Sequence, residues 1–145
     1  MNFDLLKQLL LLATGGAIGT LARYGLNGLV SHHQAKHLPW AVVFPLGTVL
    51  VNVTGCFVIG FIATVSGPAM GRAWMKPEWR DFWLVGFCGG YTTFSSYGLQ
   101  TLNLARDAEW LSVALNIVGS NVLCLLAVYL GRVCALWLET RMHGG

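Results

Sequence analysis

The chain has little charge for its size. Only 10% of its 145 residues are charged, against about 25% in a typical soluble domain, while 55% are hydrophobic. The acidic residues all lie in predicted loops or near the ends of predicted spans: Asp4, Glu78, Asp81, Asp107, Glu109 and Glu139. This composition indicates an integral membrane protein, and its length leaves no room for a separate soluble catalytic domain.

The membrane interior lacks the groups that several chemistries need. Proton-coupled transporters usually carry a carboxylate or a histidine relay inside the membrane, and here both residue types are peripheral. A Ser/His/Asp set cannot be assembled there either, so we predict that the protein is not an enzyme. No basic cluster is dense enough to indicate nucleic-acid binding, and the net charge of +3 relates instead to membrane topology and lipid headgroups.

The cysteines also fail to form a recognisable site. Their spacing fits neither a zinc site nor a secreted disulfide framework, and all of them lie in hydrophobic segments: Cys56, Cys88, Cys124 and Cys134. We interpret them as small apolar packing residues.

The hydrophobic pattern predicts one four-helix transmembrane domain over residues 1–145 of a multi-pass protein in the cell membrane. Each span needs roughly 20 apolar residues, and the predicted spans are residues 5–30, 40–66, 82–104 and 110–138. Within the second span, Pro45 and Gly47 mark a kink or a late helix start. The positive-inside rule places the termini in the cytoplasm, because six basic residues fall on their side of the membrane and two on the other.

The third span contains a polar stretch, residues 86–101, with glycines, threonines and serines but no charge. Gly89-Gly90 weakens a helix, and the hydroxyls of Thr92-Thr93 compete for backbone partners, so we predict a helix break here. Irregular backbone in a membrane must be buried in protein or line a wet cavity. Phe94 and Tyr97, three residues apart, share one helical face just after the break, and Ser95 projects elsewhere.

Polar residues in the other spans have more than one interpretation. Arg23 is the one charged residue well inside a span, and it either snorkels to the interface, biases a vestibule toward anions or donates to backbone carbonyls. Thr48 and Asn52 share a face and either join helices or line a polar path. Asn116 and Ser120 share a face in the fourth span, where they either satisfy the broken backbone or join that path.

At these residues the chain resembles the Fluc/CrcB family of fluoride channels. The run from Gly86 to Ser95 (Gly-Phe-Cys-Gly-Gly-Tyr-Thr-Thr-Phe-Ser) resembles the family signature. Three further pieces agree in order: Gly15 to Gly19 leading to Arg23-Tyr24, Gly47-Thr48 leading to Asn52, and Gly119-Ser120. The resemblance covers essentially the whole chain.

The resemblance implies an antiparallel, dual-topology homodimer with two fluoride pores. It implies a structural sodium ion at the dimer centre, held by backbone carbonyls at positions that match Gly89 and Thr92. The pore aromatic pair falls on Phe94 and Tyr97, and Arg23 matches the vestibule arginine. The polar track falls on Thr48, Asn52 and Ser95, with Ser120 added from span four.

The chain departs from the family at two positions. Phenylalanine is usual where Tyr97 stands, and serine is frequent where Gly98 stands. The leading hypothesis is a passive, fluoride-selective channel that exports cytosolic fluoride. One alternative is a weakly conducting subunit that pairs with a homologous second chain. Another is a small multidrug-type transporter, which predicts a carboxylate in span one where this chain has Arg23.

Overall fold

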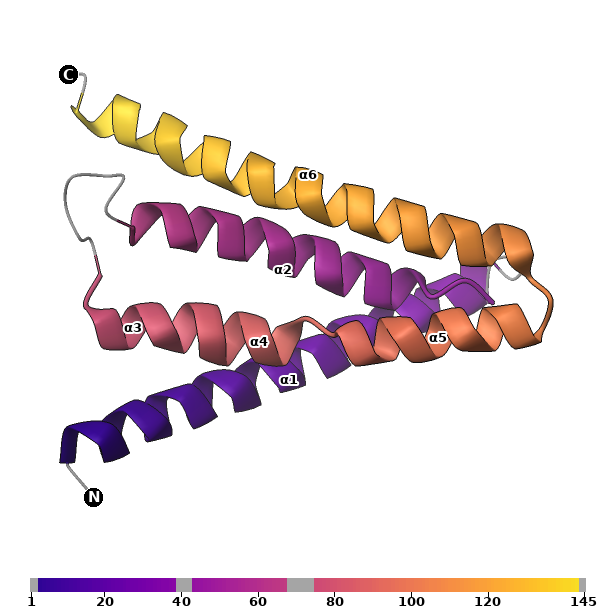
Figure 1. Cartoon of the computed structure of the whole chain (residues 1–145), viewed down its shortest axis with the longest axis horizontal. Helices are drawn as coiled ribbons and strands as arrows, with labels where there is room; N and C mark the ends of the chain where they lie inside the picture. The colour runs from indigo at the N-terminus through magenta and orange to yellow at the C-terminus, as the bar shows by residue number, and fades with distance from the viewer. Residues whose placement is uncertain (1–2, 39–42, 68–74, 144–145) are drawn as a thin grey trace.

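The computed structural model describes residues 3–38, 43–67 and 75–143, and every regular element within them is a helix. Figure 1 shows these helices with their labels. Their bounds are α1 Phe3–His37, α2 Leu46–Val65, α3 Pro77–Asp81, the π-helix η3 Phe82–Phe87, α4 Cys88–Tyr91, α5 Phe94–Arg106 and α6 Trp110–His143.

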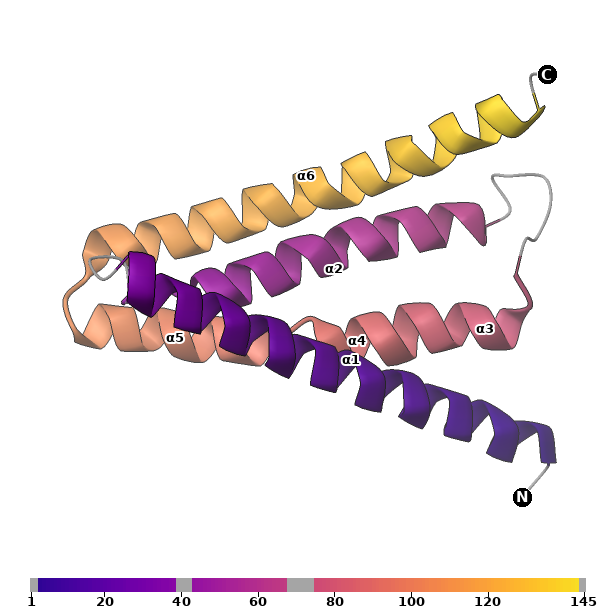
Figure 2. The same cartoon turned by 180° about the vertical axis from the view of Figure 1, so that it is seen from behind.

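The chain runs back and forth along one long axis. The short elements α3, η3, α4 and α5 follow one another in a single row, and α1 crosses this row at an angle (Figures 1 and 2). Helices α2 and α6 run in the same direction and pack extensively against each other. Both ends of the chain therefore lie at the same end of the molecule, which agrees with an even number of crossings.

Helix α1 is longer than the sequence predicts. The predicted span stops at residue 30 and is followed by a loop, but the helix continues to His37. The segment after Val30 contains no glycine or proline, so nothing in it ends a helix before Pro39. Near the end of α1 the amide of Gln34 donates a hydrogen bond of 2.8 Å to the carbonyl of Phe44, which ties α1 to the segment leading into α2.

Helix α2 starts later than the predicted span. Its first residue is Leu46, directly after Pro45, whose fixed φ and missing N–H suit the start of a helix but not its interior. The predicted start at Trp40 lies outside the described residues, as do residues 68–74 of the loop predicted between the second and third spans. Two further helices extend beyond the predicted spans. Helix α3 begins at Pro77, inside that loop, and α6 continues to His143.

Three helices in the described part of the chain are long and apolar enough to cross a membrane: Phe3–His37, Leu46–Val65 and the part of α6 from Trp110 to Arg141. The remaining row, α3 to α5, consists of pieces of 5, 6, 4 and 13 residues, none of which is long enough alone.

Glycines allow the helices to touch backbone to backbone. A Cβ at Gly19 would collide with the carbonyl of Phe87, and one at Gly90 would collide with the carbonyl of Gly16. The same arrangement joins α6 to α2, where a Cβ at Gly131 would collide with the carbonyl of Phe57. Such small-residue contacts are a principal source of helix association in lipid, where apolar side chains gain nothing by leaving hydrocarbon.

The outside of the bundle is apolar. Leu21 is 70% exposed, Leu125 is 72% exposed, and many other large hydrophobic side chains on α1 and α6 are at least half exposed. A continuous apolar exterior of this extent suits contact with lipid rather than with water.

Candidate functional site

The row of short helices is interrupted at two threonines. Helix α4 ends at Tyr91, Thr92 and Thr93 are extended, and α5 begins at Phe94. The Thr92 hydroxyl donates to the carbonyl of Cys88 at 2.9 Å, which closes the end of α4. The Thr93 hydroxyl accepts from the backbone N–H of Ser96 at 3.2 Å and so caps the start of α5. The hydroxyl of Thr92 thus closes the end of α4, and the hydroxyl of Thr93 caps the start of α5.

The side chain of Asn52 on α2 is bonded to the interruption. Its Oδ1 accepts from the backbone N–H of Thr93 at 2.8 Å, and its Nδ2 donates to the carbonyl of Thr93 at 3.1 Å. One amide therefore satisfies both backbone groups of an extended residue, which would otherwise be costly to bury in an apolar setting. Of the two sequence interpretations of Asn52, the role of joining helices is present in the structure.

A cavity of about 270 Å³ lies beside the interruption, between α2, α5 and α6. Its lining combines amides, hydroxyls, aromatic rings and thiols: Asn52, Gly55, Cys56, Ile59, Thr92, Thr93, Phe94, Tyr97, Ser120, Asn121 and Cys124. The lining contains no charged group, so the cavity offers neutral donors and acceptors only.

The two aromatic residues of α5 form a pair at this cavity. Their ring centroids are 5.2 Å apart with the planes tilted by 43°, so neither ring covers the face of the other. The hydroxyl of Tyr97 accepts from Nδ2 of Asn121 on α6 at 3.3 Å. Phe94 is 80% exposed, which leaves much of its ring uncovered by this chain.

A chain of hydrogen bonds connects α6 to α5 behind the cavity. Ser120 donates to Oδ1 of Asn116 at 3.2 Å, and Nδ2 of Asn116 donates to the Thr101 hydroxyl at 2.8 Å. Thr101 in turn donates to the carbonyl of Tyr97 at 2.8 Å. Ser120 also lines the cavity, so it faces the cavity while being held from behind.

Four of the predicted site residues do not line this cavity, and one of them, Gly89, lies in α4 just before the break. Thr48 is buried on α2, one turn before Asn52. Arg23 is half-buried on α1, one turn after Thr20, whose hydroxyl lies 3.4 Å from the carbonyl of Gly90. Ser95 is exposed, and its hydroxyl lies 3.2 Å from that of Thr93. The cavity brings together Asn52, Thr92, Phe94, Tyr97 and Ser120, and the other four lie outside its lining.

The carbonyls of Gly89 and Thr92 are among those that lose their usual helical donors at the interruption. The carbonyl of Gly89 would accept from the N–H of Thr93, but that N–H is bonded to Asn52. The carbonyl of Thr92 would accept from the N–H of Ser96, but that N–H is bonded to the Thr93 hydroxyl. Gly89 also has open space where a side chain would be. Carbonyl oxygens of this kind suit a hard cation such as sodium, so the residues present fit the implied ion.

Sequence reasoning missed several residues of the site. Asn121 and the thiols of Cys56 and Cys124 line the cavity, and the two cysteines were interpreted only as packing residues. Cys56 follows Asn52 by four residues and Cys124 follows Ser120 by four, so each cysteine continues a face that was already identified as polar. That spacing was the available signal.

These observations define an all-helical membrane protein with a neutral polar cavity beside an interrupted helix. The chain belongs to the CrcB-like protein, Camphor Resistance (CrcB) family, whose model matches residues 10–132. It is 47% identical over 131 residues to a fluoride-specific ion channel FluC of Opitutus terrae, covering 90% of this chain and 94% of the relative. It is 49% identical over 125 residues to a protein of the same name from Paramagnetospirillum magneticum, covering 86% and 92%. A third, from Rhodospirillum rubrum, is 46% identical over 130 residues, covering 90% and 95%. The chain is accordingly a multi-pass membrane protein.

Proposed function

We propose that this protein is a fluoride-selective ion channel that passively exports fluoride from the cytosol, and that it is not an enzyme. The observation that carries the proposal is its similarity to relatives named fluoride-specific ion channel, which extends over nearly the full length of both chains. The neutral cavity supports it, because a channel must attract an ion without holding it tightly.

The cavity can replace the water around a small anion with weak donors. The edges of aromatic rings carry partial positive charge, and Phe94 and Tyr97 are tilted so that ring edges are available. The Asn52 amide has two N–H donors, of which one is used on Thr93. The Tyr97 hydroxyl accepts from Asn121 and has its own O–H to donate, whereas the O–H of Ser120 is donated to Asn116. Because none of these groups is charged, an anion passing them is stabilised only modestly and can leave again.

We propose that α3, η3, α4 and α5 together make the third of four crossings, as one transmembrane helix broken at Thr92-Thr93. The pieces lie in one row between the two ends of the bundle, which supports this assignment (Figure 1). Residues 77–106, at about 1.5 Å per helical residue, are long enough for a hydrocarbon core of about 30 Å. The four spans would then form a single domain.

The proposed working unit is an antiparallel, dual-topology dimer with a sodium ion at its centre. Two carbonyls from one chain are too few for a hard cation, which typically takes about six oxygen ligands, so a second copy or water must supply the rest. The surface near the break supports the dimer as well. Gly89, Phe94 and Ser95 are all exposed, and glycine and serine beside a polar break are poorly suited to face lipid. Residues Gly89 and Thr92 would hold the ion through backbone oxygens, fixing the two breaks relative to each other.

In this dimer we assign the other predicted pore residues, which do not line the cavity, to the path that leads an ion to it. Ser95 lies one residue from Phe94 on the exposed side, where it would extend the track toward the second copy. Arg23 would raise the local concentration of anions at a vestibule without binding fluoride itself. Thr48 would extend the face of Asn52 by one turn.

A second candidate is a weakly conducting subunit that pairs with a different homologous chain. Tyr97 favours it, because its hydroxyl is bonded to Asn121 and adds bulk where the family usually has phenylalanine. The two candidates differ in whether this chain suffices alone. The small multidrug-type alternative has no comparable support.

The test of the proposal is rescue of a bacterial strain that lacks its own fluoride exporter. Expression of this chain alone is expected to restore growth in fluoride, and Phe94→Ala, expressed to the same level in the membrane, is expected to fail. Absence of rescue by well-folded wild-type protein, together with rescue when a homologous chain is added, would favour the paired-subunit candidate.

A further inference from the structure

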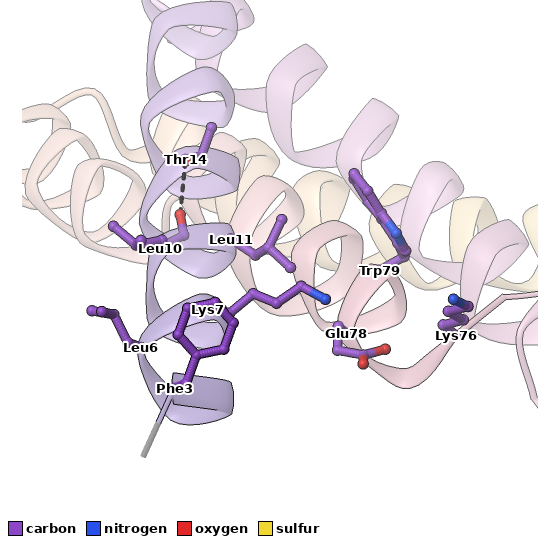
Figure 3. Close-up of a pocket in the computed structure, with 9 residues that line it drawn as sticks. All are labelled: Phe3, Leu6, Lys7, Leu10, Leu11, Thr14, Lys76, Glu78 and Trp79. Atoms are coloured by element: carbon purple, nitrogen blue, oxygen red, sulfur yellow. Dashed lines mark hydrogen bonds between the residues drawn. The ribbon is translucent and has the colours of Figure 1, made fainter. Parts of the chain in front are cut away.

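A second cavity lies far from the break, at the end of the molecule where the chain starts. It has a volume of about 420 Å³ and is formed between the first turns of α1 and the start of α3. Its lining is Phe3, Leu6, Lys7, Leu10, Leu11, Thr14, Lys76, Glu78 and Trp79 (Figure 3). Beside it, Nε2 of Gln8 donates to Oδ2 of Asp81 at 3.0 Å, which fixes the two helices around the cavity. Its volume falls within the range of about 300–1,000 Å³ that is typical of small-molecule sites.

The polar part of this cavity carries charges of both signs. Lys7 extends from α1 toward Glu78 of α3, and Lys76 lies on the other side of Glu78 (Figure 3). Oε2 of Glu78 is buried and has no hydrogen-bond partner. No ligand can reach Oε2, so a donor in the cavity would bond to Oε1 of the same carboxylate, which lines the cavity. A partly buried carboxylate is stabilised by an N–H donor with positive charge, so the cavity suits a ligand that brings one.

The apolar part of the lining includes exposed side chains on both walls of the cavity. Phe3 is 79% exposed and Leu10 is 59% exposed, and both lie on the lining of the cavity from α1. Trp79, 49% exposed, lies at the opposite wall, and tryptophan is enriched where hydrocarbon meets headgroups. Lysines near the ends of transmembrane helices likewise extend to the headgroup level. The cavity therefore joins a polar compartment to an apolar surface at the membrane interface.

We propose that this cavity binds the headgroup of a phospholipid that carries both a phosphate and a primary ammonium, with phosphatidylethanolamine as the ligand. The lysines Lys7 and Lys76 hold the phosphate, and the carboxylate of Glu78 accepts from the ammonium. The acyl chains lie along Phe3, Leu6 and Leu10. An anionic lipid without an ammonium satisfies the lysines but leaves Glu78 without a donor, and a choline headgroup has no N–H to donate.

The experiment measures lipid retention on the purified full-length protein in detergent, by native mass spectrometry, with no ion flux involved. Phosphatidylethanolamine, phosphatidylcholine and phosphatidylglycerol with identical acyl chains are added in equal amounts. A charge-assisted hydrogen bond corresponds to about tenfold in affinity, so we expect the ethanolamine lipid to be retained about tenfold over the choline lipid. It should also be preferred over the glycerol lipid.

Variants separate the two halves of the site. Glu78→Gln is expected to remove most of the preference for the ethanolamine lipid over the glycerol lipid, because the negative charge is gone. Lys7→Gln is expected to weaken retention of all three lipids. Lys36→Gln, at the other end of α1, is the matched control and is expected to behave as wild type.

Two results would overturn the proposal. One is equal retention of the three lipids by the wild-type protein. The other is an unchanged preference in Glu78→Gln that elutes as a single folded species. Preference for the glycerol lipid would make the site an anionic-lipid site, which also contradicts the assigned role of Glu78.

Discussion

The two halves of the interrupted row are held in different ways. The half before the break, η3 and α4, is held by backbone contact with α1 through Gly86 and Gly90 and by a series of aromatic neighbours from Trp79 to Tyr91. The half after the break, α5, is held by side-chain hydrogen bonds, from Asn52 to Thr93, from Asn116 to Thr101 and from Asn121 to Tyr97. Close glycine packing leaves no room for a ligand, whereas amide and hydroxyl contacts leave donors at the cavity wall. The rigid half fixes the position of the break, and the polar half supplies its chemistry.

The largest effect on stability is expected when a side chain is introduced at the backbone contact between α4 and α1. In Gly90→Val the added side chain must displace the carbonyl of Gly16, and backbone cannot move aside as a flexible side chain does. We expect destabilisation of about 3 kcal/mol, at the upper end for overpacking, measured as a lowered thermal unfolding temperature in detergent. The control is Gly98→Ala on α5, where a Cβ meets open space and alanine is expected to stabilise the helix by about 0.5–1 kcal/mol. Equal losses in both variants would contradict the distinction between the two halves.

The second largest loss of stability is expected from substitution of Asn52. Asn52→Ala leaves both backbone groups of Thr93 without partners, at a cost of about 1–3 kcal/mol for a buried unsatisfied group. Flux should be lost as well, since the break is no longer fixed and one donor is removed. Asn121→Ala is the matched control and should remain close to wild-type stability. It removes the bond to the Tyr97 hydroxyl and an exposed bond to the carbonyl of Ile117 in its own helix, and it leaves the backbone of the break paired. If the two variants were equally stable, Asn52 would not hold the break.

The cysteines allow the cavity to be blocked by covalent modification. Cys56 and Cys124 line it, while Cys134 is exposed elsewhere on α6. Treatment with a small uncharged thiol-modifying reagent should fill the cavity and reduce fluoride flux. The reduction should persist in Cys134→Ser and disappear in the double variant Cys56→Ser/Cys124→Ser. Persistence of the inhibition in the double variant would place the ion path elsewhere.

The smallest effect is expected at the hydroxyl of Tyr97. Tyr97→Phe keeps the ring and its partner Phe94 but loses one bond of 3.3 Å, so stability should change by less than about 1 kcal/mol. Fluoride flux should be unchanged or improved, whereas Tyr97→Ala should lose it. Complete loss of flux in Tyr97→Phe would mean that the hydroxyl itself is required.

Particular residues show which features could be predicted from the sequence. Thr92-Thr93 located the interruption, because threonine hydroxyls act locally, whereas Gly89-Gly90, which were also expected to weaken the helix, are helical in α4. The partner of Asn52 could not be predicted, since it depends on how α2 and the break meet in space. The continuation of α1 to His37 was missed although no residue between Val30 and Pro39 ends a helix. The π-helix η3 packs against α1, and that tertiary contact could not be predicted from the sequence. Arg23 and Ser95 were identified as polar residues of the spans and then matched to the family, and in this chain both lie outside the lining of the cavity.

The most direct test of the central claim is ion efflux from liposomes that contain this protein alone. Fluoride and chloride efflux are measured from the same preparation, with Phe94→Ala as the paired variant. The account predicts rapid fluoride efflux, no chloride efflux and loss of fluoride efflux in the variant. Efflux of both ions, or no fluoride efflux from protein shown to be folded and inserted, would contradict the claim that this chain by itself forms a fluoride-selective channel.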